Sequence, residues 1–150
     1  MIAERSGHNV LMGISDENET YITFQMTYKE AINALEIAHI RKKECPVVWN
    51  EKIGYWKLLK DMSQQQQCKE FVSKKIDALI QYDKENESDL IETLEALVNH
   101  LGARNITATS LYLHRNTLMY RIKKIENLTG YDLSDPESIL ELSLALRLNK

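Results

Sequence analysis

The segment from Asn105 to Gly130, NITATSLYLHRNTLMYRIKKIENLTG, contains two short helical patterns joined by only a few residues. Two helices with a tight join form a helix-turn-helix, in which the second helix is presented for recognition. The first pattern runs from Ala108 to Leu113, with Thr107 as its expected cap, and Ala108 is small where two helices must approach closely. The segment therefore predicts an all-α domain in this part of the chain.

Basic side chains gather in the same segment, although the chain as a whole has a formal net charge of −3 at pH 7. The segment and the residue before it contain five basic residues and one acidic residue, Glu126. The basic residues are Arg104, Arg115, Arg121, Lys123 and Lys124. A short basic helix on an acidic protein provides a local electrostatic footprint for the phosphate backbone of DNA. From charge alone, the competing interpretation is a solvated basic helix.

The second helical pattern separates apolar from polar side chains. Its apolar face, which can pack on the two preceding helices, consists of Leu118, Ile122 and Ile125. The opposite face consists of Asn116, Tyr120, Lys123, Lys124 and Asn127. His114 is expected to cap this helix, so that Arg115, Asn116 and Thr117 occupy its first turn.

The side chains in the first turn of a recognition helix meet base edges in the major groove. Arg115 can bind guanine through two hydrogen bonds, and Asn116 can bind adenine in the same way. Lys123 and Lys124 are placed for phosphates, which position a protein without specifying sequence. Arg121 lies nearer the apolar face, so pairing with a carboxylate is its alternative role. The predicted DNA-binding residues are His114, Arg115, Asn116, Thr117, Tyr120, Arg121, Lys123 and Lys124.

Tyr112 and His114 lie at the join between the two helical patterns. Tyr112 occupies the turn, where glycine is common, which favours a join longer than that of the tightest motifs. His114 is interpreted as a cap rather than a catalytic base because no acid or nucleophile stands near it in sequence. We expect no catalytic residue, no metal site and no cofactor.

Other helices are expected on both sides of this pair. One contains apolar residues at helical spacing between positions 71 and 80 and ends near Tyr82. The next has an apolar face over residues 90–101, with Ser88 or Asp89 as its cap and Gly102 at its end.

The last helix is apolar around most of its circumference. Ser134 or Asp135 is its expected cap, and Pro136 suits its first position. A helix that is apolar on nearly every side must be covered on more than one face. We therefore expect a homodimer contact through this helix that includes Leu144 and Leu148. The alternative is that helices of the same chain cover it.

The first 62 residues combine strand and helix patterns. Asn9–Ser15 and Tyr21–Phe24 are expected to form a β-hairpin around the polar turn Asp16–Glu19. Val47–Trp49 is a candidate third strand, and a short helix is expected from Ile53 to Met62.

Between these strands, Thr27 and Glu30 have the spacing of a capping box at the start of a helix whose basic end precedes Pro46. The polar run Ser63–Gln67 is expected to be a linker. The predicted fold is α+β and mainly α. It has a small partial αβ segment at 1–62, a linker and connecting helix at 63–87, and a helix-turn-helix domain at 88–150.

Composition excludes several classes of protein. No apolar run approaches the roughly 18 residues of a membrane span, and no basic-then-apolar secretory signal stands at the beginning of the chain. Cys45 and Cys68 have no metal-ligand spacing and are expected to be reduced thiols. We therefore expect a cytoplasmic protein without a membrane partner.

The sequence LHRNTLMYRIKKIENLTGYDL, from Leu113 to Leu133, resembles the C-terminal DNA-binding domain of the PucR/CdaR family of bacterial transcriptional regulators. The resemblance extends upstream to Leu90 and downstream through the last helix, with HRNTLxYRI and LTGxDL in the family's order. The recognition helix is also similar to that of Fis-type nucleoid proteins. The resemblance implies a cytoplasmic, dimeric regulator that responds to a metabolite such as a purine, a sugar diacid or an amino acid.

Residues from Val10 to about Lys60 resemble the second half of the GGDEF-like domain that precedes this module in the family. The earlier half of that domain and a separate effector domain are absent, as is the GGDEF signature with the acidic metal-binding loop of a nucleotide cyclase. We therefore expect a C-terminal fragment or truncated member whose effector metabolite binds a region absent from this chain.

Three functions compete. The first is a DNA-binding transcriptional regulator, and the second is a protein-interaction or oligomerisation module without direct DNA readout. Salt-dependent binding to duplex DNA separates these two. The third is a degenerate nucleotide cyclase. Its only clustered acids would be Asp16, Glu17 and Glu19, which are more simply a solvated turn, so we expect no enzymatic activity.

Overall fold

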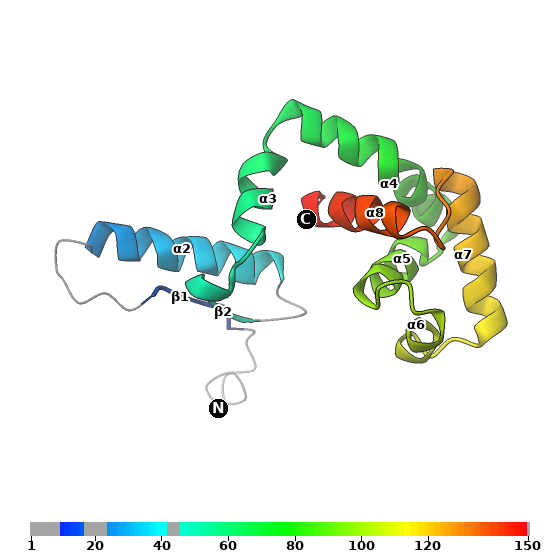
Figure 1. Ribbon diagram of the computed structural model, residues 1–150, viewed down its shortest axis with the longest axis horizontal. Coiled ribbons are helices and arrows are strands. Elements are labelled where there is room, and N and C mark those ends of the chain that lie inside the picture. Colours follow the sequence, from blue (N-terminus) through cyan, green and yellow to red (C-terminus); the bar gives the residue numbers. More distant parts are fainter. Residues whose placement is uncertain (1–9, 17–23, 42–45, 150) are drawn as a thin grey trace. The chain divides into compact units, whose positions relative to one another are not determined.

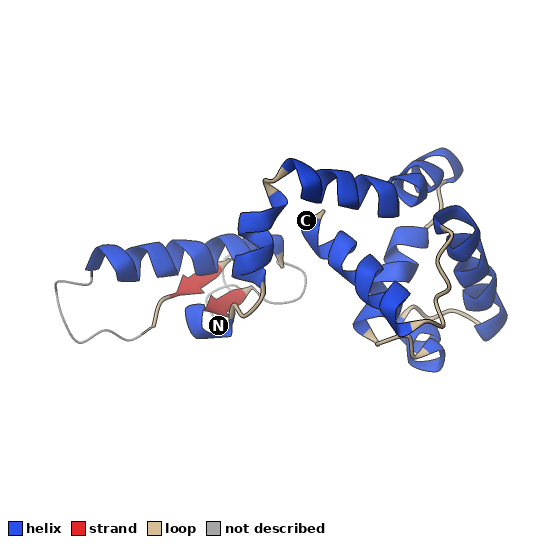
Figure 2. Cartoon of the chain, turned by 45° about the horizontal axis from the view of Figure 1, so that its top comes forward, coloured by secondary structure: helices blue, strands red, loops and turns tan. Residues whose placement is uncertain are grey.

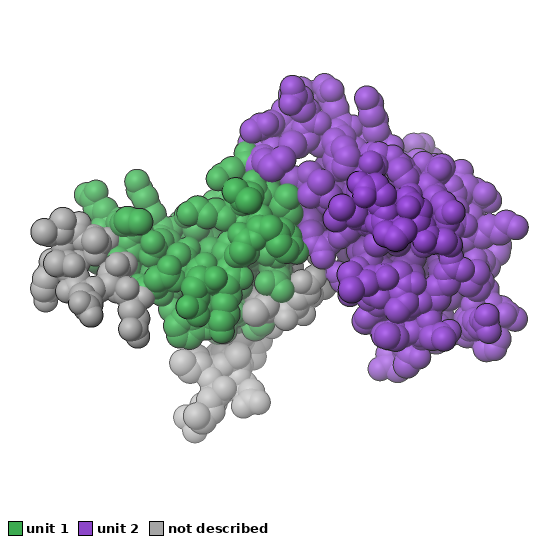
Figure 3. All heavy atoms as spheres, viewed as in Figure 1, with its two compact units in different colours: residues 1–61 green, residues 62–150 purple. Residues whose placement is uncertain are grey.

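The computed structural model describes residues 10–16, 24–41 and 46–149. The chain divides into two compact units, residues 1–61 and residues 62–150 (Figure 3). The described part is mostly helical and includes a small two-stranded parallel sheet in the first unit (Figures 1 and 2). None of the described helices has the length and the apolar run that a membrane span requires.

The first unit is a strand–helix–strand arrangement. Strand β1 (Met12–Ile14) pairs in parallel with β2 (Val47–Trp49), and helix α2 (Phe24–Ile40) provides the crossover that parallel strands need. Gly13 allows β1 to lie directly against α2, because a Cβ at this position would come within 2.2 Å of the Leu35 backbone nitrogen. The buried residues of this unit are Ala34, Ile37, Ala38, Val48, Ile53, Trp56 and Leu59.

The second strand of the predicted β-hairpin lies mostly outside the described residues. The partner of β1 is β2, and Phe24 is the first residue of α2 rather than the last residue of a strand. Thr27 consequently lies inside the helix and is not its cap. A short alternating run does not show where a strand ends and a helix begins, and Phe24 was assigned to the wrong element for this reason. Residues 17–23 and 42–45 lie outside the described residues.

The predicted strand at Val47–Trp49 is confirmed. The helix expected from Ile53 begins three residues later as α3 (Trp56–Ser63), after the 3-10 turn η2 (Asn50–Lys52). The side chain of Asn50 donates a hydrogen bond of 2.8 Å to the Asp16 carboxylate, which ties the end of β2 to the residues that follow β1.

The second unit packs five helices around one core. These are α4 (Gln66–Asn86), α5 (Leu90–Asn99), α6 (Arg104–Ser110), α7 (Arg115–Thr129) and α8 (Pro136–Leu148). Helix α4 contributes Val72, Ile76 and Leu79 to this core. It begins inside the expected linker and runs past Tyr82, so the predicted connecting helix is an integral part of the unit.

The cap of α5 comes from the preceding helix. Neither Ser88 nor Asp89 caps α5 with its side chain, contrary to expectation. Instead, Asp83 in the last turn of α4 accepts hydrogen bonds from the backbone N–H groups of Leu90 (2.9 Å) and Ile91 (2.8 Å). A carboxylate at this place satisfies two otherwise unpaired donors and is favoured by the helix dipole. Asp83 therefore fixes the turn between α4 and α5.

Candidate nucleic-acid interface

Helices α6 and α7 form the helix-turn-helix expected from sequence, although α6 begins earlier than predicted. Thr107 is fully buried, and its hydroxyl donates to the Ala103 carbonyl at 3.0 Å, so it lies inside α6 and does not cap it. Ala108 is buried, as its small size suggested. The error arose because a threonine can bond to the backbone four residues back as readily as it can cap a helix.

The join between α6 and α7 consists of residues 111–114. The N–H of Tyr112 donates to the Thr109 carbonyl at 3.1 Å, and the N–H of Leu113 donates to the Ala108 carbonyl at 2.9 Å. This pair of bonds is the Schellman motif, which places its left-handed residue at a position that usually holds glycine. Tyr112 occupies it with a φ of 54° and is 96% exposed. A side chain in this conformation costs roughly 1–2 kcal/mol.

Helix α7 is held by its apolar face and displays its polar face. The predicted cap is confirmed, because Nδ1 of His114 accepts the N–H of Asn116 at 3.3 Å. The buried face consists of Leu118, Ile122 and Ile125, as predicted. The side chains of Arg115, Asn116 and Thr117 are exposed in the first turn, and Tyr120 is 69% exposed one turn later. These residues are therefore exposed to solvent above a buried core.

Arg121 is engaged within the fold. Its guanidinium forms an ion pair with Asp89 at 3.0 Å and donates a second hydrogen bond to the hydroxyl of Thr93 at 3.0 Å. Thr93 is fully buried. The alternative foreseen for Arg121, pairing with a carboxylate, is the arrangement found. The contact joins the middle of α7 to the beginning of α5.

The two lysines predicted to bind phosphates have different surroundings. Lys123 is exposed on the outer face of α7. Lys124 is half-buried, and its Nζ lies 4.5 Å from the ring centroid of Tyr82, which belongs to α4. A cation over an aromatic face is attracted to it by the ring quadrupole. Lys124 therefore has a partner inside the protein, whereas Lys123 projects into solvent.

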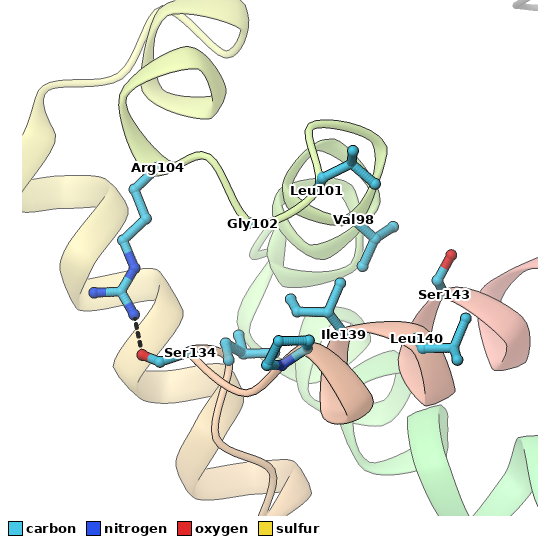
Figure 4. A pocket seen from close by; sticks show the side chains of 10 residues that line it. Val98, Leu101, Gly102, Arg104, Ser134, Ile139, Leu140 and Ser143 are labelled. Carbon is cyan, nitrogen blue, oxygen red and sulfur yellow. Dashed lines mark hydrogen bonds between the residues drawn. The ribbon is translucent and has the colours of Figure 1, made fainter.

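Arg104 is a basic residue outside the set predicted to bind DNA. It begins α6, and its guanidinium donates to the hydroxyl of Ser134 at 2.8 Å (Figure 4). Together with Tyr120, Lys123 and Asn127 it lines a hollow of about 760 Å³ beside the exposed face of α7. In the sequence, only its position at the edge of the basic segment indicated a role in the site. The packing of α6 against α7 places Arg104 at the same hollow as Lys123.

A second, mostly apolar hollow of about 530 Å³ lies between the end of α5 and the beginning of α8 (Figure 4). Val98, Leu101, Ile139 and Leu140 lie along it, and Leu101 and Leu140 are 89% and 61% exposed. The other sides of α8 are covered within the chain by burial of Leu142, Ala145 and Leu146, and Leu148 packs partly against the same core.

The start of α8 matches the prediction. Asp135 is the cap and accepts the N–H of Ser138 at 2.9 Å, and Pro136 occupies the first turn. Hydrogen bonds from the backbone N–H and then the hydroxyl of Ser138 hold the pKa of the Asp135 carboxyl below its usual value.

Part of the second unit matches a known protein domain. Residues 90–148 match the family model of the PucR C-terminal helix-turn-helix domain. The chain is 30% identical over 142 residues to the proline-responsive transcriptional activator PutR of Bacillus subtilis (strain 168), covering 94% of the chain and 34% of the relative. It is 30% identical over 141 residues to the purine catabolism regulatory protein of the same organism, covering 94% of the chain and 26% of that protein.

A third relative from Bacillus subtilis (strain 168), the DNA-binding transcriptional activator AdeR, is 24% identical over 123 residues, covering 81% of the chain and 29% of that protein. The chain thus spans about a third or less of the length of these curated relatives. No solved structure matches the chain. Residues 90–148 are therefore a PucR C-terminal helix-turn-helix domain, and the chain is homologous to PucR-family regulators.

Proposed function

We propose that this chain regulates transcription by laying α7 in the major groove of an operator. One observation carries the proposal. The first turn and the outer face of α7 are exposed above a buried core, and no acidic residue occurs between Arg104 and Lys124 in a chain with a net charge of −3. A surface of this kind attracts the phosphate backbone and leaves base-reading side chains free.

The side chains on this surface have distinct roles. Arg115 and Asn116 hydrogen-bond to base edges, with guanine and adenine as their partners. Thr117 and Tyr120 border the same contact, and His114 holds the first turn in place as its cap. Lys123 binds a phosphate.

Three other basic residues contribute in different ways. Arg104 adds a second phosphate contact from the neighbouring helix, since it shares a hollow with Lys123. Arg121 positions α7 through Asp89, and Lys124 does so in part through Tyr82. Both therefore act on DNA mainly by orienting the recognition helix.

Selection of duplexes from a random pool by the purified chain tests this function. An operator motif should emerge, and the logarithm of its binding constant should fall linearly with the logarithm of the salt concentration. A protein-interaction module would enrich no motif and would bind duplexes with no such dependence. That result would leave the interaction module as the function of the chain.

The same function calls for a homodimer, because one helix-turn-helix contacts few base pairs and two half-sites about one helical turn apart give specificity. The hollow between α5 and α8 supports a second copy of the chain as the partner. Across a two-fold axis, the exposed Leu101 or Leu140 of one copy can enter the apolar hollow of the other copy, so the surface is self-complementary. We place the dimer contact there and not at Leu144 and Leu148.

The first unit belongs to the same regulator. The similarity to PutR covers 94% of the chain and so includes both units. We infer that residues 1–62 are part of a GGDEF-like domain that has no cyclase activity, and that the effector metabolite binds elsewhere in a longer cytoplasmic protein. Asp16 accepts a hydrogen bond from Asn50, which gives this acid a structural role. Formation of a cyclic nucleotide from a nucleoside triphosphate with magnesium or manganese would contradict this inference.

A further inference from the structure

Three long side chains in the second unit occupy a backbone conformation that favours glycine: Glu87 at the end of α4, and the almost fully exposed Leu101 and Tyr112. Tyr112 has a φ of 54° and is 96% exposed, and Leu101 has a φ of 51° and is 89% exposed. The helices α5 and α6 both end in a Schellman motif with one of these residues at its left-handed position. In contrast, α7 ends with Gly130 at a φ of 76°. Glycine closes such a turn without the steric cost that a Cβ brings.

Neither Leu101 nor Tyr112 offsets the free-energy cost of the left-handed conformation by packing inside the protein. Burial stabilises a side chain in proportion to the area removed from water, and an exposed tyrosine or leucine removes almost none. Backbone strain without a gain in the fold is found at sites of function. Leu101 borders the apolar hollow where the dimer contact is proposed. Tyr112 lies elsewhere, three residues before the first residue of α7.

The position of Tyr112 identifies what it can touch. In a helix-turn-helix the first helix crosses the DNA backbone while the beginning of the second enters the major groove, so the turn between them lies at the edge of the groove. The phenol of tyrosine is a hydrogen-bond donor to phosphate oxygens. Thr109 and Ser110 are exposed at the end of α6, and no acidic residue occurs between Arg104 and Lys124 to repel a phosphate near Tyr112.

We propose that the hydroxyl of Tyr112 donates a hydrogen bond to a phosphodiester oxygen at the edge of the major groove, and that it aligns α7 in the groove. This inference rests on the proposed DNA-binding function. Because the donor is neutral, it releases no counterion and leaves the salt dependence of binding unchanged. Because phosphates are the same at every base pair, it strengthens binding to all duplexes alike.

The experiment compares the full chain with three variants, Tyr112→Phe, Tyr112→Gly and Tyr28→Phe, on the selected operator and on a random-sequence duplex. Tyr112→Phe removes the hydroxyl alone. Tyr112→Gly removes the whole side chain and relieves the left-handed conformation. Tyr28→Phe removes an exposed tyrosine hydroxyl in the first unit and is the matched control, because Tyr28 is 60% exposed.

Tyr112→Phe and Tyr112→Gly should each weaken binding to both duplexes about tenfold without changing the salt slope. Tyr112→Gly should at the same time unfold at the same or a higher temperature than the parent, which excludes damage to the fold as the cause. Tyr28→Phe should bind both duplexes with the affinity of the parent, because Tyr28 lies outside the helix-turn-helix.

Three outcomes would overturn the proposal while leaving the DNA-binding function intact. These are full affinity in Tyr112→Gly, full affinity in Tyr112→Phe, and a loss confined to the operator, which would indicate contact with a base. Failure of the parent chain to bind either duplex is a different result, because it would refute the DNA-binding function together with this contact.

Discussion

Neighbouring side chains on α7 serve different purposes, and their surroundings separate them. Arg115 and Lys123 are exposed, whereas Arg121 is tied to Asp89 and Thr93. All three are basic, so the sequence places them together in one site. Substitutions at these positions should therefore give different combinations of lost stability and lost DNA affinity.

Arg115→Ala should cost about 1–3 kcal/mol of binding free energy on the selected operator and relax the preference at one base pair. Lys123→Ala should weaken binding to every duplex alike and reduce the salt slope by about one unit. Titrations of both variants on operator and random duplexes over a salt series measure this. Equal losses on both kinds of DNA for both variants would contradict the division between base and phosphate contacts.

Arg121→Ala should instead lower the free energy of unfolding, by about 1–2 kcal/mol, because it leaves the buried Thr93 hydroxyl without a donor and breaks a partly solvated ion pair. Urea unfolding measures the change, and Lys123→Ala is the matched control, with no expected loss of stability. If Arg121→Ala is as stable as its parent and yet fails to bind DNA, Arg121 contacts DNA directly.

The helices of the second unit depend on caps that come from different distances in the chain. Asp135 caps α8 from the position next to it, and Asp83 caps α5 from the end of the preceding helix. The first kind of cap can be predicted from sequence because its partner N–H lies within three residues. The second kind requires the turn between two helices to be known.

The cap at Asp135 should make the stability of the protein depend on pH in acid. The pKa of this carboxyl is lowered in the folded state, so its contribution is complete above its unfolded-state pKa and is lost as the pH falls through the folded-state pKa. Asp135→Ala should reduce the urea midpoint at neutral pH, and the difference from the parent should shrink on acidification. Asp135→Asn, which caps without titrating, should show a smaller loss at neutral pH. A difference independent of pH would contradict the role of the carboxylate.

At the scale of the whole chain, α4 belongs to the second unit because its apolar face completes the core around α7 and α8. A fragment of residues 62–150 should therefore unfold cooperatively and bind operator DNA. A fragment of residues 88–150 should be poorly folded, because the loss of Val72, Ile76 and Leu79 exposes core side chains worth about 1.5–3 kcal/mol each. Circular dichroism during thermal unfolding measures both. Equal stability of the two fragments would show that α4 is a connecting helix and not part of the folded domain.

The dimer should depend on the apolar hollow between α5 and α8. Leu140→Gln should shift the chain towards the monomer in light scattering and weaken binding to a two-half-site operator more than to one half-site. Leu58→Gln is the matched control, because Leu58 is a 65% exposed leucine in the first unit. A chain that is monomeric at high concentration and binds its operator tightly would contradict the dimer.

Local patterns in the sequence predicted much of the second unit correctly. The period of Leu118, Ile122 and Ile125 identified the buried face of α7, and the His114 and Asp135 caps were found where spacing placed them. These features depend on residues a few positions apart, whose geometry a helix repeats. The clustering of basic residues in one short segment was also visible in the sequence, because it depends only on which residues occur and in what order.

Features that depend on distant partners were decided only by the tertiary structure. Strands β1 and β2 pair although the whole of α2 lies between them in the sequence, and Asp83 caps α5 from the preceding helix α4. Two basic residues of α7 have partners within the protein: Arg121 pairs with Asp89 at the start of α5, and Lys124 lies over the ring of Tyr82 in α4. The other basic residues of α7 are exposed. Local spacing determines which face a helix buries. Which side chains remain free to bind DNA depends on what the neighbouring helices bring to that face, because an ion pair or ring contact forms between residues that only packing brings together.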